Sequence, residues 1–237
     1  MPADSNISPA DGVAAAIGDG KKHLLLCASG SVAVIKLPSI VRYLVGKHES
    51  LSIRIILTEN AARFFNGTCE LEQPSLQALR SIRGVDGLYR DEDEWNPPWR
   101  RGAAILHIEL RRWADIMVIA PTSANTLAKL AGGMCDGLLT SVARAWDPAR
   151  GRIIVAPAMN SFMWAHPVTA KHIGQLEGEW GAHHGGWFVV LSPVAKKLAC
   201  GDEAMGAMVH WIALSEVVIR MLRPWPLSEL LQQSEAA

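Results

Sequence analysis

Short hydrophobic runs alternate along the chain with stretches of helical periodicity. Runs of this kind are typical of strands buried on both faces of a parallel sheet. Strands that alternate with helices favour right-handed crossovers, with helices on both faces of the sheet. The pattern therefore predicts a single α/β domain with a mainly parallel sheet. The expected strands cover residues 24–28, 52–58, 115–120, 153–156 and 187–191.

Other stretches lack this pattern. Residues 1–21 are rich in Gly, Ala, Asp, Ser and Pro, and we predict that they are disordered. Residues 67–102 form a long irregular excursion, and excursions of that length tend to be functional or disordered. We expect the folded domain to span residues 22–222, followed by a Trp- and Pro-containing tail at 223–237 without an assigned role.

Composition excludes several classes of protein. Net formal charge is zero and no basic stripe is present, which argues against nucleic acid as the main partner. No hydrophobic run approaches the ~20 residues that span a bilayer, so we expect no membrane partner and no signal peptide. Widely spaced cysteines disfavour a zinc site or a disulfide framework and favour a reducing, cytoplasmic location. Of these, Cys27 and Cys135 are expected in the core.

The segment Pro157–Trp164 contains the most informative polar residue. A proline ends the hydrophobic run before it, and Asn160 follows. The carboxyl edge of an open parallel sheet is where ligands bind, so Asn160 is a candidate binding residue. The alternative is that Asn160 caps the next helix.

Hydroxyl-rich turns follow two other strands. Ser29–Val32 follows the first strand and Pro121–Thr126 the third. Free backbone amides and the helix dipole at such turns attract phosphate, although plain helix capping is the alternative. The segments lack a full GxGxxG or P-loop spacing, which disfavours dinucleotide and ATP sites and suits a mononucleotide such as FMN.

Two further residues could carry proton chemistry. His107 lies in an expected short amphipathic helix, where it is either structural or a proton carrier. Cys200 lies in an expected loop beside Lys196 and Lys197, whose charge would lower the pKa of a thiol; an inert thiol is the alternative. The pair His183–His184, in the Gly- and His-rich segment 177–186, is expected to be a solvated turn and not a metal site.

Read together, these segments resemble the phosphopantothenoylcysteine decarboxylases, a branch of the flavin-dependent cysteine decarboxylase family. The resemblance covers about residues 22–210, and its combination of motifs in one order is more specific than any single motif. The segments that carry it are 28–33, 106–113, 120–121, 123–127, 131–136, 144–147, 157–164, 197–202 and 206–208.

The resemblance implies a flavodoxin-like, Rossmann-type fold and a homotrimer with FMN at the subunit interface. Ala158 would pack against the flavin ring. The residues implied to bind the cofactor are Gly30, Ser31, Val32, Thr58, Glu59, Asn60, Ser123, Ala124, Asn125, Thr126 and Ala158.

The resemblance also implies the reaction. The cysteine part of phosphorylated pantothenoyl-cysteine would be oxidised to a thioaldehyde, lose carbon dioxide and be reduced again to give phosphopantetheine for coenzyme A biosynthesis. His107 would serve the decarboxylation and Cys200, on a mobile loop, would supply a proton. Asn160 would hold the substrate carboxylate, with Met163, Lys197 and Ala199 as further substrate contacts, and a solvated role for the lysine is the alternative.

Two other functions compete with this enzyme. Some fungal relatives inhibit a protein phosphatase or form part of a mixed trimer, but they carry long extensions and some lack the His or the Cys. This chain has His107, Asn160 and Cys200 and a short tail. The third possibility is a flavodoxin-like electron carrier, which usually has a strongly acidic surface that a neutral chain does not provide.

Overall fold

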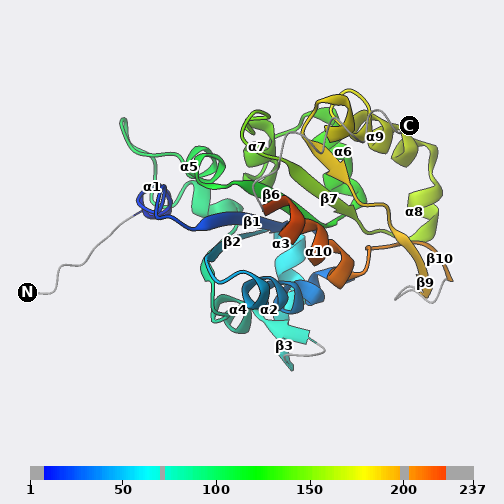
Figure 1. The fold of residues 1–237 in the computed structure, drawn as a ribbon, viewed down its shortest axis with the longest axis horizontal. Coiled ribbons are helices and arrows are strands. Elements are labelled where there is room, and N and C mark those ends of the chain that lie inside the picture. The colour runs from blue at the N-terminus through cyan, green and yellow to red at the C-terminus, as the bar shows by residue number, and fades with distance from the viewer. Residues whose placement is uncertain (1–7, 70–72, 198–202, 223–237) are drawn as a thin grey trace, which may run out of the picture.

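The computed structural model describes residues 8–69, 73–197 and 203–222 of the 237-residue chain. A six-stranded sheet runs through the middle of the molecule (Figure 1), and every pairing within it is parallel. Its strands are β1 (Lys22–Ala28), β2 (Leu51–Leu57), β5 (Val85–Tyr89), β6 (Ile116–Thr122), β7 (Ile153–Pro157) and β8 (Phe188–Val190).

The sheet order is β5-β2-β1-β6-β7-β8. The chain starts in the middle, builds outward through β2 and β5, and then returns to the other side of β1. The carboxyl ends of β1 and β6 are therefore the point where the strand order reverses, which is where open α/β sheets bind ligands. The predicted single α/β domain, with a mainly parallel sheet of the flavodoxin-like type and helices on both faces, is confirmed.

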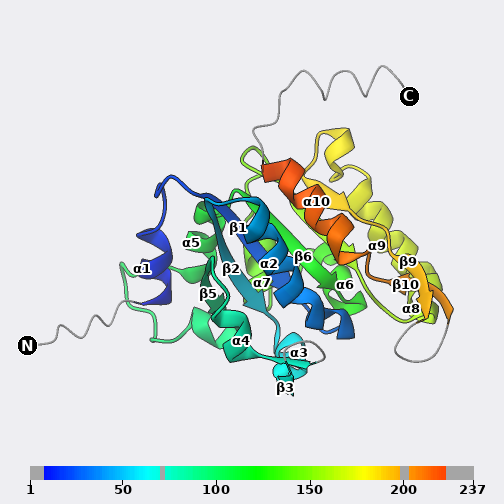
Figure 2. The same cartoon turned by 60° about the horizontal axis from the view of Figure 1, so that its bottom comes forward.

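Helices cover both faces of the sheet. Figure 2 shows α2 and α10 over one face, while α5, α6, α7 and α9 lie over the other. The helices are α1 (Pro9–Ala14), α2 (Leu37–Lys47), α3 (Glu59–Ala62), α4 (Leu76–Arg80), α5 (Leu106–Trp113), α6 (Ala124–Gly132), α7 (Leu138–Arg144), α8 (Ser161–Ala165), α9 (Pro167–Glu177) and α10 (Trp211–Leu222). Short 3-10 helices are η1 (Val32–Lys36), η2 (Arg63–Phe65), η3 (Asp91–Glu94) and η4 (Ala182–His184).

Strand β1 shows how the continuous hydrophobic runs serve both faces. Leu24 and Leu26 belong to the core beneath α2 and α10, while Leu25 and Cys27 belong to the core beneath α5, α6 and α7. All four side chains are fully buried. Because successive side chains of a strand point to opposite faces, a strand covered on both sides is mainly hydrophobic along its length.

The structure corrects the expected irregular excursion at residues 67–102. This region contains α4 and β5, and β5 pairs with β2 as an edge strand of the main sheet. It also contains part of a small hairpin formed by β3 (Asn66–Cys69) and β4 (Gln73–Ser75). The strand was missed because β5 has the sequence VDGLY, in which only its last two residues are buried, so it has no continuous hydrophobic run.

The structure also differs from the disorder expected for residues 1–21. Helix α1 lies within this segment, with Ser8 capping its first turn and Ala10 and Val13 buried against the core that contains α5. Ala10 and Val13 lie on the same side of this short helix, and their burial is enough to pack it against the core. Nearby, the His23 ring stacks on Trp113 with centroids 4.5 Å apart and contacts Asp19 through Nε2 at 2.9 Å.

A second hairpin lies at one end of the sheet. Strands β9 (Val194–Lys197) and β10 (Glu203–Ala207) are antiparallel, and β10 contacts α8. Figures 1 and 2 both place this hairpin beside α8. Within the residues described, no helix has the length and hydrophobicity needed to cross a membrane.

Candidate functional site

Two adjoining clefts open at the carboxyl edge of the sheet. The larger encloses about 550 Å³ and the smaller about 350 Å³. They share Gly30, Ser123, Ala124 and Met163 in their walls, so they form one continuous site. All the residues predicted to bind a cofactor line one or both clefts.

Ser29 joins the two loops at the point where the strand order reverses. It is 1% exposed, and both its backbone N–H and its hydroxyl donate to the Pro121 carbonyl, at 3.0 and 3.1 Å. The same hydroxyl accepts from the Ser123 backbone N–H at 2.8 Å. One side chain therefore holds the loop after β1 against the loop after β6.

Gly30 allows the loops after β1 and β2 to approach closely. A Cβ atom at this position would lie 2.7 Å from Cβ of Asn60, which is too close for any real contact. Thr58 begins the second loop by capping α3, accepting from the Ala61 N–H at 3.3 Å. The glycine therefore brings two polar turns together, as a bound anion requires.

Ser123 caps α6 in the same way. Its hydroxyl accepts from the Thr126 backbone N–H at 3.3 Å, and the helix ends at Gly133 in the left-handed region. The other amides of the first turn, with the helix dipole, create a region that favours negative charge. The predicted residues Asn125 and Thr126 lie on this turn.

Ala158 and Asn160 form the wall on the β7 side. Ala158 is 4% exposed and donates its backbone N–H to the Thr122 carbonyl at 2.9 Å. Asn160 caps α8, with Oδ1 accepting from the Phe162 N–H at 2.8 Å, and it also lines the larger cleft. The capping alternative is therefore observed, and it does not compete with a binding role because capping fixes the orientation of the carboxamide.

The hairpin of β9 and β10 supplies residues that sequence reasoning did not select. Gly206 accepts from the Met159 N–H at 2.9 Å, and a Cβ there would lie 2.4 Å from the Met159 carbonyl oxygen. Residues 206–211 line the larger cleft together with Lys36. The sequence signal that could have indicated these residues is the segment Gly206–Met208, which contributes to the family resemblance but had no role assigned to it.

Three of the four charged residues in the walls of the smaller cleft are in ion pairs, and the fourth, Asp91, accepts from the Leu138 backbone N–H at 2.7 Å. Lys129 bonds Asp136 at 2.6 Å, and this hydrogen bond lowers the pKa of the Asp136 carboxyl. A hydrogen bond from Arg63, at 2.5 Å, lowers the pKa of Glu59 in the same way. Both carboxylates are thus ionised at neutral pH and partly neutralised by their partners, so backbone amides and hydroxyls are the groups left to meet an anion.

The residues fit the FMN that the resemblance implies. The helix N-termini at Thr58 and Ser123, held together through Gly30, match the needs of a phosphate. The small, buried side chain of Ala158 leaves room for a flat aromatic ring beside it. Of the described residues, no group of His, Cys, Asp and Glu has the arrangement of a metal site, and His183–His184 lie exposed on η4 with ring centroids 4.3 Å apart.

His107 lies apart from both clefts. It is the second residue of α5, and its side chain is 25% exposed. Nδ1 lies 2.7 Å from Oε1 of Glu94, and the His107 backbone N–H donates to Oε2 of the same carboxylate at 3.2 Å. Glu94 was missed by sequence reasoning because it lies in the stretch expected to be irregular.

The cysteine predictions have separate outcomes. Cys27 is buried as predicted, and burial raises the pKa of its thiol. The prediction for Cys135 is wrong: it is exposed, because the left-handed turn at Gly133 ends α6 and leads the chain into a surface loop before α7. Ala199 and Cys200 lie outside the described residues, and for Lys197 the structure describes the backbone alone, in β9.

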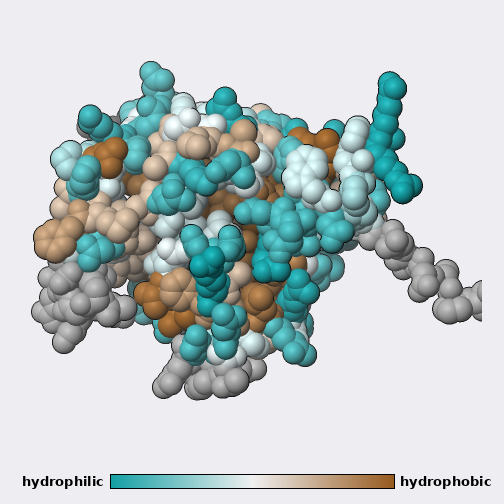
Figure 3. Space-filling model, turned by 180° about the vertical axis from the view of Figure 1, so that it is seen from behind, coloured by the Kyte–Doolittle hydropathy of each residue, from teal (hydrophilic) through white to brown (hydrophobic). Residues whose placement is uncertain are grey.

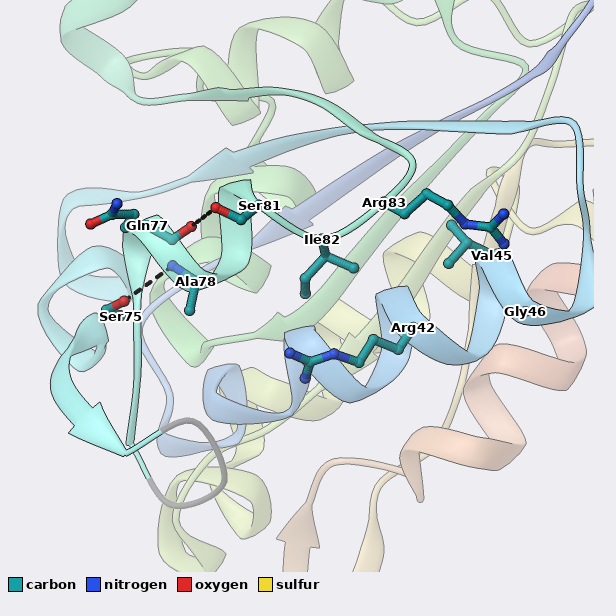
Figure 4. Close-up of a pocket in the computed structure, with 9 residues that line it drawn as sticks. All are labelled: Arg42, Val45, Gly46, Ser75, Gln77, Ala78, Ser81, Ile82 and Arg83. Atoms are coloured by element: carbon teal, nitrogen blue, oxygen red, sulfur yellow. Dashed lines mark hydrogen bonds between the residues drawn. The ribbon is translucent and has the colours of Figure 1, made fainter.

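A larger hollow of about 660 Å³ lies between α2 and α4 (Figure 4). It is an open surface groove whose hydroxyls are used within α4: Ser75 caps the helix and Ser81 donates to the Gln77 carbonyl. Of the predicted site residues that the structure describes, none lines this groove. Its size therefore does not make it the better candidate.

The surface around the clefts is partly apolar. Phe162 and Met163 on α8 are 79% and 50% exposed. Viewed from behind, hydrophobic side chains gather at the end of the molecule that carries α8 (left in Figure 3), beside broad hydrophilic areas. Such exposed apolar residues at the rim of a cleft mark a surface suited to contact with another molecule.

Known proteins resemble this chain in sequence. The sequence profile of the family described as Flavoprotein matches residues 15–223. A protein named phosphopantothenoylcysteine decarboxylase from Oryza sativa subsp. japonica is 41% identical over 208 residues, which cover 88% of this chain and 84% of the relative. One of the same name from Mus musculus is 42% identical over 80% of this chain and 82% of its own length.

Longer relatives also match. The chain spans 28% of the length of a "Probable thymidylate synthase" from Schizosaccharomyces pombe and 34% of "Coenzyme A biosynthesis protein 3" from Saccharomyces cerevisiae, with 42% and 41% identity. These relatives therefore contain much more chain than the region they share with this one.

Solved structures match the fold. A cysteine-to-serine mutant of PPC decarboxylase, complexed with pantothenoylaminoethenethiol, aligns with a TM-score of 0.72 and 39% identity over 86% of this chain and all of that one. The FMN-binding protein AtHal3 aligns with a TM-score of 0.67 and 40% identity over 84% and 96% of the two chains. From the profile match and these relatives, the chain belongs to the Flavoprotein family.

Proposed function

We propose that this protein is an FMN-dependent phosphopantothenoylcysteine decarboxylase of coenzyme A biosynthesis. The observation that carries the proposal is the joining of two capped helix N-termini, Ala158 and Asn160 in one continuous site at the point where the strand order reverses. The names of the relatives support the reaction, and AtHal3 is a relative whose name includes FMN binding. We place the enzyme in the cytoplasm, as its free cysteines suggest.

The smaller cleft binds the cofactor phosphate. The amides after Thr58 and Ser123 and the hydroxyls of the two loops donate to it, while Gly30 keeps the backbones close enough for both to reach. Ala158, in the wall of the larger cleft, would hold the flavin ring. When bound, FMN supplies hydride acceptance and return, so the overall reaction has no net redox change.

The larger cleft binds the substrate. Asn160 presents its carboxamide, oriented by the cap of α8, to the substrate carboxylate, and Met163 covers the apolar part. We assign Lys197 and Ala199 as further substrate contacts. Cys200 supplies the proton that completes the product, and closing the site excludes water from the reactive intermediate.

His107 serves the decarboxylation from a neighbouring protomer of a homotrimer. Within one chain the histidine lines neither cleft. The exposed apolar residues of α8, next to the cleft, provide a surface for the neighbour. A single protomer is therefore incomplete, and activity requires assembly.

The decisive experiment combines flavin content with product analysis. Purified protein should be yellow, with about one FMN per chain, and should release carbon dioxide from phosphorylated pantothenoyl-cysteine. Solution mass should correspond to three chains. Colourless protein that gains no flavin on incubation with FMN, or flavin-loaded trimer that releases no carbon dioxide, contradicts the proposal.

A further inference from the structure

Glu94 makes two hydrogen-bond contacts with His107, which lies 13 positions further along the chain. The Glu94 side chain is 6% exposed, and each of its oxygens meets a different nitrogen of the same residue. A carboxylate with both oxygens directed at the side chain and backbone of one histidine fixes where that histidine lies and how its ring is turned.

The backbone half of this contact replaces a missing helix cap. Ile105 at the start of α5 provides no side-chain cap, so the first N–H groups of the helix need another acceptor. Glu94 accepts the His107 N–H at 3.2 Å from outside the helix. Because a negative charge beside a helix N-terminus is favourable, this half of the contact also holds η3 against α5.

The side-chain half selects a tautomer. An ionised carboxylate can only accept hydrogen bonds, so Nδ1 of His107, 2.7 Å from Oε1, must carry a proton. In a neutral imidazole the lone pair is then on Nε2. Among the described residues none bonds to Nε2, and the ring is 25% exposed.

We propose that Glu94 is a positioning residue that holds His107 in the Nδ1–H tautomer and presents Nε2 to the reacting substrate. This inference rests on the proposed function for the part that His107 plays there. Glu94 itself touches neither cleft and acts through the histidine.

Glu94→Gln tests the tautomer directly. The His107 backbone N–H can only donate, so the carboxamide oxygen turns toward it and the NH₂ group faces Nδ1. The ring must then accept at Nδ1 and carry its proton on Nε2, which is the wrong arrangement. We expect kcat to fall about 100-fold, as when a proton carrier is lost or wrongly protonated, with KM and bound FMN within twofold of wild type.

The matched control is Glu92→Gln. Glu92 lies on the same 3-10 helix but pairs with Arg90 at the surface, so its substitution should leave kcat unchanged. A purely structural role for Glu94 would lower FMN content and thermal stability along with kcat. Equal kcat in the two Gln variants overturns the proposal.

A spectroscopic measurement needs no activity. In ¹⁵N-labelled, FMN-loaded protein, two-bond ¹H–¹⁵N correlations should show His107 as the Nδ1–H tautomer, with the signal assigned by its loss in His107→Asn. In Glu94→Gln the signal should change to Nε2–H. An Nε2–H tautomer in wild type overturns the proposal, whereas wild-type protein that shows Nδ1–H but releases no carbon dioxide contradicts the proposed reaction alone.

Glu94→Asp separates positioning from folding if the Gln variant loses flavin. The shorter side chain keeps a carboxylate acceptor for Nδ1–H, so it should retain the wild-type tautomer and at least tenfold more activity than Glu94→Gln. An Asp variant that folds and binds FMN, yet is no more active than the Gln variant, is incompatible with the proposal.

Discussion

The two polar regions of this molecule are assembled in different ways. In the clefts, Thr58, Ser123 and Asn160 each cap the helix that directly follows them, with hydrogen bonds across two or three residues. The contact between His107 and Glu94 instead joins two elements across 13 residues. The side chains that cap the cleft helices are therefore oriented by local backbone geometry, whereas the orientation of His107 depends on how one segment packs against another.

The largest expected effect is on His107 itself. His107→Asn should bind FMN as wild type does, because the residue lines neither cleft, yet lose carbon dioxide release by about 10²–10⁴-fold. Flavin absorbance and product release should be measured on the same sample. His172→Asn, on α9, is the control, and equal losses in the two variants would contradict a special role for His107.

Cys200→Ser should separate carbon dioxide release from the later formation of the reduced product. Carbon dioxide release should continue, since the thiol acts only afterwards, but the reduced product should fall at least tenfold while an oxidised enethiol accumulates and the flavin stays reduced. Mass spectrometry of the products with absorbance at the flavin band measures both. Normal yield of the reduced product would show that another group donates the proton.

Gly30→Ala should weaken FMN binding in the clefts and leave the position of His107 unchanged. The added Cβ would lie 2.7 Å from Cβ of Asn60, so the loops after β1 and β2 must separate, and we expect at least tenfold weaker FMN binding. Gly46→Ala is the matched control, because a Cβ on Gly46 in α2 meets nothing within 4 Å. Fluorescence titration with FMN measures the difference, and equal affinities would contradict the close approach.

Ser123→Ala removes the side-chain cap of α6, together with the 3.3 Å hydrogen bond from the Ser123 hydroxyl to the Thr126 hydroxyl. The loss should be about 1 kcal/mol in unfolding free energy, from the lost bond to the Thr126 N–H. The hydrogen bond from the Ser123 backbone N–H to the Ser29 hydroxyl remains, so FMN binding should weaken only modestly. Chemical denaturation with and without FMN checks this, and a loss above about 3 kcal/mol would show that the hydroxyl has a larger role than capping.

The smallest effect concerns the core beneath the clefts. Burial raises the pKa of the Cys27 thiol, so raising the pH to about 8.5 should not produce the reactive thiolate while the protein is folded. Exposed Cys135 should be alkylated about 100-fold faster, as peptide mapping would show. Similar rates at the two cysteines would indicate that the sheet opens readily.

The sequence predicts the parts of the fold whose signal is continuous. Strands β1, β6, β7 and β8 are predicted because hydrophobic side chains occupy both of their faces, and β2 is predicted from its run of Ile and Leu although Ser52 and Arg54 lie on its second face. The edge strand β5 is not predicted, because only its last two residues are buried and its sequence therefore contains no continuous hydrophobic run. Helix α1 was missed because its seat is built from small residues whose burial depends on α5 and the core beside it.

The same distinction holds for the site. The cleft residues could be chosen from sequence because Ser, Thr, Asn and Gly at strand ends have known geometric uses, although their roles in binding remain predictions. Glu94 could not be chosen, because nothing in the pattern of residues 67–102 links it to α5. Lys36 and His210 reach the larger cleft through the packing of η1 and the segment before α10, which no motif indicates.

The buried hydroxyl of Ser29 couples the loops that follow β1 and β6. It donates to the Pro121 carbonyl and accepts from the Ser123 amide, so two neighbouring strand ends move as a unit. A displacement of one loop must therefore break these hydrogen bonds or move the other loop with it.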